Sequence, residues 1–534
     1  MALSAALLRR SPVARAGGRL SWRPNIELLA LLGYGLLLAA FFVLRSGGHW
    51  ADGDSARQAL AVRSMLDSGQ LNDPNGDVYT NGFGYTALAA FIAQFSGVSV
   101  ATLQQLVFPL VSALLVVPAF ALYQELTGSR KAATLATVLL FFQPEFLFVI
   151  LRGSHERMLR ALMLTAFWLL VRSARLRDKP RQLAIHVALF YLTTFGIIAT
   201  NALFGISFAT AIAAAMALAW LTGRHRPGLL SLAGGAAGRL AWVAATVSAI
   251  GFLFMFWLYP PASKSLQLLH DLGSRVGALF LTTHTSTASN PYAAVVGGWV
   301  DLRVYAAVSI SDYLLMLLSG VVWAAIGFRW LIRRERPRTA AVWWLWLLYG
   351  AFAFQGAFSM LVDRGGLLGN LEQRSFPSFA MVATPLLALA LVRLRLGPAL
   401  RIAAGLGLAA MAGLAILKAT NEPSVSNKWT FYTPFELQAM DFADAHNYSQ
   451  LTWSGPDERL SSAFLLVRGN ATDYNDWDQY VPKPPVRTFL LSDVMRMQSS
   501  RLEQPLPPLA QADQVYDDGA AQLYHLRPES PFEH

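Results

Sequence analysis

Long apolar runs dominate this sequence and limit what it can fold into. Such runs, each of about 17–25 residues, recur from Ile26 to Leu417, and a helix of that length spans the hydrocarbon core of a bilayer. The 534-residue chain is 54% hydrophobic and 14% charged, whereas a soluble chain is about one quarter charged. The sequence therefore predicts a mainly α, polytopic membrane protein with about eleven transmembrane helices. These are expected near 26–44, 103–127, 131–150, 157–173, 182–200, 202–222, 240–258, 304–331, 340–361, 376–396 and 399–418.

The same pattern predicts three parts of the chain. Residues 1–25 form a basic N-terminus, residues 26–418 carry the apolar runs, and residues 419–534 contain no such run. We therefore expect one large transmembrane domain followed by a small domain outside the membrane.

The C-terminal part mixes helical and strand signals. Residues 435–446 have helical periodicity, and the short apolar runs 464–467 and 488–491 are typical of strands. Residues 515–524 are typical of a hairpin with Asp-Gly in its turn. These signals predict a small α/β domain.

The basic residues indicate orientation. The net charge is +11, but the arginines cluster in short loops between apolar runs, so they follow the positive-inside pattern and do not indicate a nucleic-acid partner. This predicts a multi-pass plasma-membrane protein with a cytoplasmic N-terminus and an extracytoplasmic C-terminal domain. The chain has no cysteine, so thiolate chemistry is excluded. The predicted outer loops are 45–102, 152–157, 259–303 and 362–375.

Acidic residues lie just beyond the first predicted span. Asp52 and Asp54 follow it closely, and carboxylates near lipid are costly unless they face water, a partner or a metal. Asp54 also begins a predicted amphipathic helix, where a carboxylate can simply cap free amides. The predicted orientation places His155 and Glu156 on the same outer face, so these residues form a candidate site.

These motifs resemble a known family. Asp-x-Asp-Ser at 52–55, with a helix ending in Met-Leu-Asp-Ser-Gly at 65–69, resembles the first outer loop of oligosaccharyltransferase catalytic subunits. Those are membrane enzymes of the GT-C glycosyltransferase superfamily. The likeness continues to Gly-Ser-His-Glu at 153–156 and covers about residues 45–160. Glu-Gln-Arg-Ser-Phe-Pro at 372–377 resembles the family's arginine-containing entry to a late span.

The chain also departs from the family pattern. At positions 154–156 the family has a second outer acidic motif, with an Asp two residues before an Asp or Glu; here Ser154 replaces the first acid and Glu156 keeps the second. No glutamate occurs in 287–291, where the family has a Glu-bearing acceptor loop. The C-terminal part lacks the Trp-Trp-Asp-Tyr-Gly acceptor motif. These departures argue against glycosylation of asparagine sequons and favour another acceptor.

The resemblance implies a GT-C-like fold and an inverting glycosyltransferase at the extracytoplasmic face. The donor would be a polyprenyl-phosphate or polyprenyl-pyrophosphate sugar or glycan. The acceptor would be a glycan, lipid or protein, and membrane lipids would surround the enzyme.

The candidate residues divide by chemistry. A base must orient or deprotonate the acceptor, and guanidinium groups grip phosphate in bidentate geometry. Hard oxygen ligands also suit Mg2+ or Mn2+, although a metal-independent mechanism fits equally well. The assignments are Asp54 and Asp52 as catalytic residues; Arg374, Glu372 and Arg152 at the donor phosphate; and Asp52, Asp54, His155 and Glu156 as candidate metal ligands.

Other interpretations remain open at this point. Arg374 could be an arginine that snorkels at a helix end, and His155 could be an ordinary interfacial residue. The chain could instead be a lipid or small-molecule transporter or flippase, or a scaffold whose outer domain binds a partner.

Overall fold

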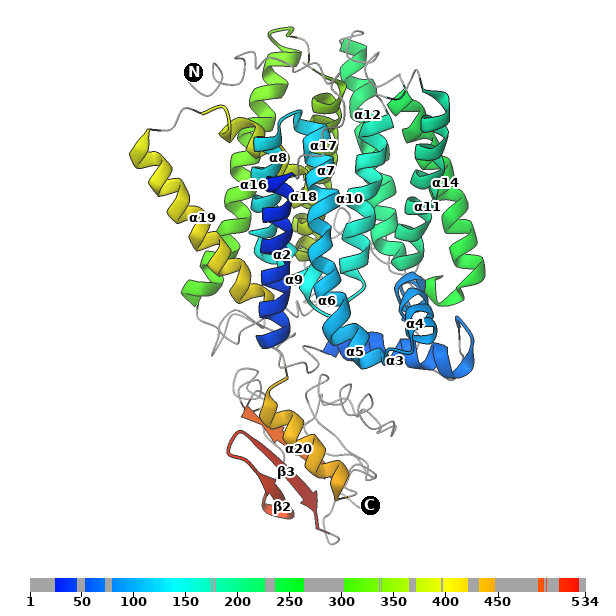
Figure 1. Ribbon diagram of the computed structural model, residues 1–534, viewed down its shortest axis with the longest axis vertical. Coiled ribbons are helices and arrows are strands. Elements are labelled where there is room, and N and C mark those ends of the chain that lie inside the picture. The colour runs from blue at the N-terminus through cyan, green and yellow to red at the C-terminus, as the bar shows by residue number, and fades with distance from the viewer. Residues whose placement is uncertain are drawn as a thin grey trace, which may run out of the picture.

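The structure is a computed structural model in which a helical bundle carries a small domain at one end (Figure 1). It describes residues 25–45, 53–72, 79–173, 176, 179–225, 236–263, 302–335, 337, 339–364, 371–394, 397–420, 432–446, 488–493, 496 and 509–527.

The helices of the bundle follow the apolar runs. Their bounds are α2 Ile26–Arg45, α3 Gly53–Ser68, α4 Gly84–Ser96, α5 Val100–Thr102, η1 Leu103–Val107, α6 Phe108–Ser112, η2 Ala113–Leu115, α7 Val116–Thr127, α8 Arg130–Phe141, α9 Pro144–Leu151, α10 Glu156–Ser173, α11 Pro180–Thr200, α12 Ala202–His225, α14 Ala236–Leu258, η3 Pro260–Ala262, α16 Leu302–Leu331, α17 Ala340–Arg364, α18 Leu371–Leu391 and α19 Pro398–Ala419.

The chain is a multi-pass membrane protein with the predicted mainly α architecture. In the described ranges, eight helices are long and apolar enough to cross a membrane, or nine if the bent pair α8 and α9 is one span. Helices occupy all eleven predicted spans. Two of these helices are outside that count: α10, because it contains four charged residues, and α14, because its apolar part, Ala244–Leu258, is shorter than a membrane span.

The predicted span 131–150 is not a continuous helix. Helices α8 and α9 meet at an angle of 73°, with Pro144 in the first turn of α9. Proline cannot continue the hydrogen bonding of α8, so the chain turns there. Every residue of α9 is buried. The break therefore forms a short buried helix that ends at Arg152.

One end of the bundle carries the outer helices of the predicted first loop. Helices α3, α4 and α5 lie at the lower end in Figure 1, on the side where the C-terminal domain hangs. We call this the site end.

The C-terminal domain contains the predicted helix and hairpin. Helix α20, Pro434–Ala445, begins with a capping box: the Thr433 and Glu436 side chains each accept the other's backbone N–H. It packs on an antiparallel sheet of order β1-β3-β2. The strands are β1 Thr488–Ser492, β2 Ala512–Asp517 and β3 Ala521–Leu526. The predicted run 464–467 lies outside the described residues.

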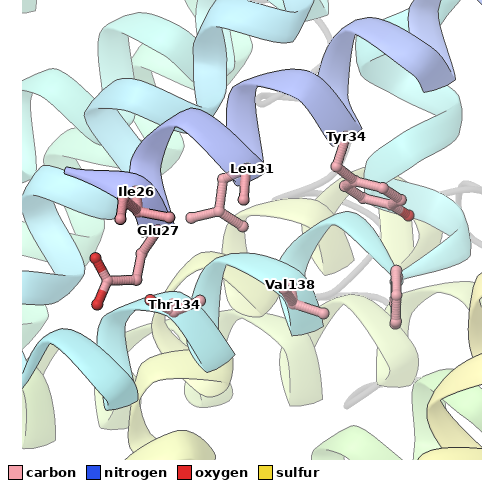
Figure 2. A pocket seen from close by; sticks show the side chains of 8 residues that line it. Ile26, Glu27, Leu31, Tyr34, Thr134 and Val138 are labelled. Carbon is pink, nitrogen blue, oxygen red and sulfur yellow. The ribbon is translucent and has the colours of Figure 1, made fainter. Parts of the chain in front are cut away.

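An apolar pocket lies away from the site end, between the first half of α2 and α8 (Figure 2). Its volume is about 390 Å³, and Leu31, Tyr34 and Val138 line it. None of the predicted site residues lines this pocket.

Candidate functional site

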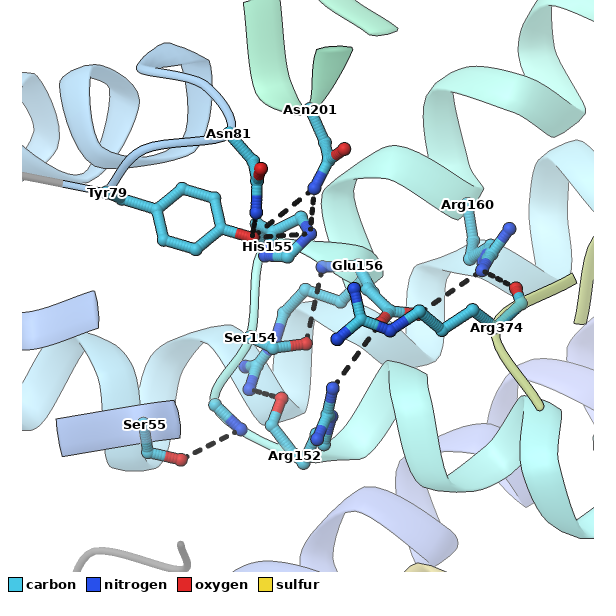
Figure 3. A network of polar contacts seen from close by, with 12 residues as sticks. Ser55, Tyr79, Asn81, Arg152, Ser154, His155, Glu156, Arg160, Asn201 and Arg374 are labelled. Carbon is cyan, nitrogen blue, oxygen red and sulfur yellow. Dashed lines mark hydrogen bonds and ion pairs between the residues drawn. The ribbon is translucent and has the colours of Figure 1, made fainter. Parts of the chain in front are cut away.

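A close backbone approach joins the two predicted acidic segments. Ser55, in the first turn of α3, is buried and accepts the backbone N–H of Gly153 at 3.1 Å (Figure 3). A β-carbon at position 153 would overlap the Ser55 side chain. Glycine is therefore required here for close contact. This contact brings the start of α3, which contains Asp54, against the turn that contains His155 and Glu156.

A buried carboxylate lies at the centre of this region. Glu156 begins α10, and its Oε1 and Oε2 accept from Nη2 of Arg152 at 3.3 Å and Nη2 of Arg160 at 3.2 Å. All three residues are buried. Removing one partner of a buried ion pair costs about 3–5 kcal/mol, so the group is held as a unit.

Arg160 ties this unit to α18. Its Nη1 donates to the Ser378 hydroxyl at 2.5 Å, and its Nη2 donates to the Arg374 carbonyl at 3.4 Å. The Arg374 side chain points from α18 toward Glu156 and interacts with it electrostatically (Figure 3). The structure thus brings Arg374 and Arg152, both predicted to bind phosphate, to one carboxylate.

Three guanidinium groups act on Glu156, those of Arg152, Arg160 and Arg374. Arg157 is also buried and donates to the backbone carbonyls of Leu151 and Arg152. Guanidinium groups bind phosphate oxygens in bidentate geometry, so a cluster of this kind is suited to an anionic ligand.

A second polar network adjoins the arginine cluster through His155 (Figure 3). Nε2 of His155 accepts from Nδ2 of Asn201 at 2.9 Å, and the Tyr79 hydroxyl lies 3.3 Å from the same nitrogen. Nδ2 of Asn81 donates to the Tyr79 hydroxyl at 3.4 Å. Because Nε2 accepts, the ring proton is on Nδ1. Amide and hydroxyl groups of this kind can hydrogen-bond neutral hydroxyl-rich ligands.

Two close contacts hold the loop that carries Tyr79 and Asn81. A β-carbon on Gly82 would lie 2.5 Å from the carbonyl oxygens of Ala199 and Thr200, so only glycine fits against the end of α11. The Tyr259 hydroxyl donates to the Tyr79 carbonyl at 2.7 Å. Burial raises the pKa of Tyr259 above its ordinary value, so it remains a donor at neutral pH.

The described metal-ligand candidates do not converge on one point. Both oxygens of Glu156 contact guanidinium groups, and the lone pair of His155 Nε2 accepts from Asn201. A cation at Glu156 would lie beside the guanidinium groups of Arg152 and Arg160, where repulsion between like charges opposes it. No group of three acidic or histidine side chains that could hold a metal occurs in the described residues. As they lie, His155 and Glu156 do not fit a shared metal ion.

Other predicted residues are only partly described. Asp52 and the loop 264–301, including 287–291, lie outside the described residues. Asp54 and Glu372 lie in the first turns of α3 and α18, but their side chains lie outside the described part. Since α3 begins at Gly53, Asp54 is the second helical residue and does not occupy the capping position.

The sequence interpretation did not identify several residues of the site. It missed Tyr79, Asn81 and Asn201. Asn201 lies between two apolar runs, where a lone amide at a helix break is a signal that could have been used. Nothing local in the sequence indicates that Tyr79 meets His155.

Comparison with known proteins supports the fold. No protein-family model and no curated protein sequence matches the chain. Among solved structures, archaeal oligosaccharyltransferase AglB from Archaeoglobus fulgidus, in complex with an inhibitory peptide and a dolichol-phosphate, is similar with a TM-score of 0.58 and 14% identity. The similarity covers 96% of this chain and 75% of that chain.

Two further structures agree. ArnT from Cupriavidus metallidurans bound to undecaprenyl phosphate has a TM-score of 0.52 and 12% identity, over 95% of this chain and 99% of that chain. The A. fulgidus oligosaccharyltransferase in complex with Zn and sulfate has a TM-score of 0.56 and 13% identity, over 93% and 73%. The chain therefore has the fold of these structures, and the predicted fold, that of oligosaccharyltransferase catalytic subunits, is confirmed.

The Ser55–Gly153 contact generates a testable prediction. We expect Gly153→Ala to destabilise the protein by about 1–3 kcal/mol, because the added methyl group overpacks a buried contact. Thermal unfolding in detergent would measure this. Gly356→Ala is the control, since a β-carbon there meets no atom within 4 Å. Equal unfolding temperatures for the two variants would contradict the close packing.

Proposed function

We propose that this protein is an inverting glycosyltransferase that moves a sugar or glycan from a polyprenyl-phosphate or polyprenyl-pyrophosphate donor to an acceptor at the extracytoplasmic face. The proposal rests on the convergence of α3, the Arg152–Glu156 pair and Arg374 at one end of a GT-C-like fold. The neighbours' complexes with dolichol-phosphate and undecaprenyl phosphate support a lipid-phosphate donor.

The proposed reaction needs a base and a charge-stabilising group. The acceptor nucleophile loses its proton to Asp54, with Asp52 as its partner, and attacks the anomeric carbon from the face opposite the phosphate. The bond between the anomeric carbon and the phosphate oxygen breaks, and the configuration inverts. The phosphate leaves with added negative charge.

Arginines are proposed to stabilise that charge. Arg374 and Arg152 lie together at Glu156, and guanidinium–phosphate pairs are strong in a low-dielectric site. No step in this scheme requires a divalent cation, which fits the engagement of Glu156 by two guanidinium groups.

The His155 network is proposed to lie beside the donor sugar. Tyr79 and Asn81 are half-buried, and they adjoin the arginine cluster through the His155–Glu156 peptide. Amide and phenol groups are suitable partners for sugar hydroxyls. The arginines would thus bind the phosphate of the donor, and the His155 network would bind its sugar.

The transporter interpretation has less support. Its substrate and ion sites would be expected near the midplane of the bundle. The clustered buried charge of the described residues lies at the site end, together with the hydrogen-bonding groups described above.

The base assignment is tested with Asp54→Asn. We expect sugar transfer to fall by at least about a thousandfold, because the amide cannot accept the acceptor's proton, while insertion and thermal stability stay unchanged. The assay measures transfer from a polyprenyl-phosphate sugar in purified protein. Asp67→Asn, at the exposed end of the same helix, is the matched control. Full activity of Asp54→Asn would refute the assignment.

The phosphate assignment is tested with Arg374→Met. Loss of one guanidinium–phosphate contact is expected to weaken donor binding about tenfold to a hundredfold. The measurement is the donor KM, together with the Kd for polyprenyl phosphate. Arg130→Met removes an exposed arginine that begins α8, at the other end of the bundle, and serves as the control. If both variants bind the lipid equally well, Arg374 does not contact the phosphate.

A further inference from the structure

The last helix of the bundle packs on α9, and one buried ion pair links the two helices. Helix α19 is mostly exposed: in the stretch of it that could span a membrane, only 6% of the residues are buried. Its buried residues, Ala415, Lys418 and Ala419, all lie at its C-terminal end. There Nζ of Lys418 lies 3.4 Å from Oε1 of Glu145, and both side chains are buried.

The Lys418–Glu145 pair lies beside Arg152. Nζ of Lys418 is 5.0 Å from the centre of the Phe148 ring, and Cζ of Arg152 is 4.8 Å from the centre of the same ring. Residues 145, 148 and 152 are spaced at i, i+3 and i+7, so they share one face of α9. A continuous chain of contacts therefore runs from Lys418 through Glu145 and Phe148 to Arg152, and from there to Glu156.

We propose that Lys418 is a positioning residue for Arg152. By neutralising Glu145, it leaves Arg152 directed at Glu156 and at the donor phosphate. This rests on the proposed function, because it assigns Arg152 to that phosphate. Lys418 lies in the last turn of α19, at the end of the helix that leads toward the C-terminal domain (Figure 1). The position of this turn would therefore affect Arg152 and the phosphate that it is proposed to bind.

The physical reason is competition between two buried carboxylates. Without Lys418, the Glu145 carboxylate is buried without its cation, which is strongly unfavourable. Arg152 shares the Phe148 ring with Lys418, so it is the cation placed to replace it. Drawn toward Glu145, Arg152 moves away from Glu156 and from the phosphate.

The test measures the affinity for a short-chain polyprenyl phosphate in purified full-length protein. Lys418→Met is expected to weaken binding about tenfold, an effect of the size of one charge-assisted contact. The double variant Lys418→Met/Glu145→Gln removes both charges and is expected to restore affinity to within about threefold, because no unpaired charge remains. The donor KM is expected to rise in parallel in the single variant and to return toward its original value in the double variant.

A second ion pair elsewhere in the bundle, with a half-exposed arginine, provides the control. Arg172 Nη1 lies 3.2 Å from Oε2 of the buried Glu125, and neither residue contributes to the site. Arg172→Met should lower the unfolding temperature and leave lipid-phosphate affinity unchanged. If Lys418→Met has no effect on affinity, or if Arg172→Met has an equal effect, the positioning role is overturned.

A second variant avoids the buried unpaired charge altogether. Phe148→Leu removes the shared ring and is expected to weaken binding in the same direction, by about threefold. Phe146→Leu, at another buried ring of α9, should not change affinity. Equal affinities for these two variants would overturn the inference. Failure of the unaltered protein to bind polyprenyl phosphate would instead overturn the proposed function, and the inference with it.

Discussion

The Glu156 carboxylate, buried between Arg152 and Arg160, is the interaction on which the site depends. It joins the end of α9 to α10, and Arg160 continues the link to α18 through Ser378 and the Arg374 carbonyl. An ionised group in a membrane bundle persists only when it is paired. Two consecutive helices, α9 and α10, and the distant α18 therefore converge on one charge, and the guanidinium groups gathered there make that place suitable for phosphate.

The break between α8 and α9 makes this convergence possible. A straight span over 131–150 would continue in the direction of α8, whereas the turn at Pro144 produces a short buried helix directed at the site. The turn after α9 then passes against Ser55 with only a glycine between them. The acidic start of α3 and the arginine cluster are thus brought together by one proline and one glycine.

Much of the fold could be predicted from the sequence, because lipid imposes a simple rule on apolar length. The spans, the helix at 434–445 and the terminal hairpin follow from periodicity and turn residues. The bend at Pro144 was missed, since the flanking apolar residues suit a straight helix equally well. At the site, Arg152, Glu156 and Arg374 were predicted and lie together. Tyr79 and Asn201 were not, because they meet His155 only through long-range packing.

We propose that arginines, and not a divalent cation, hold the donor phosphate. A density map of the protein with bound polyprenyl phosphate, prepared in the presence of Mn2+, tests it most directly. We expect phosphate density against the guanidinium groups of Arg374 and Arg152, with Glu156 still paired to Arg160. A phosphate held by an ion between Asp54 and Glu156, or one bound away from this cluster, would contradict it.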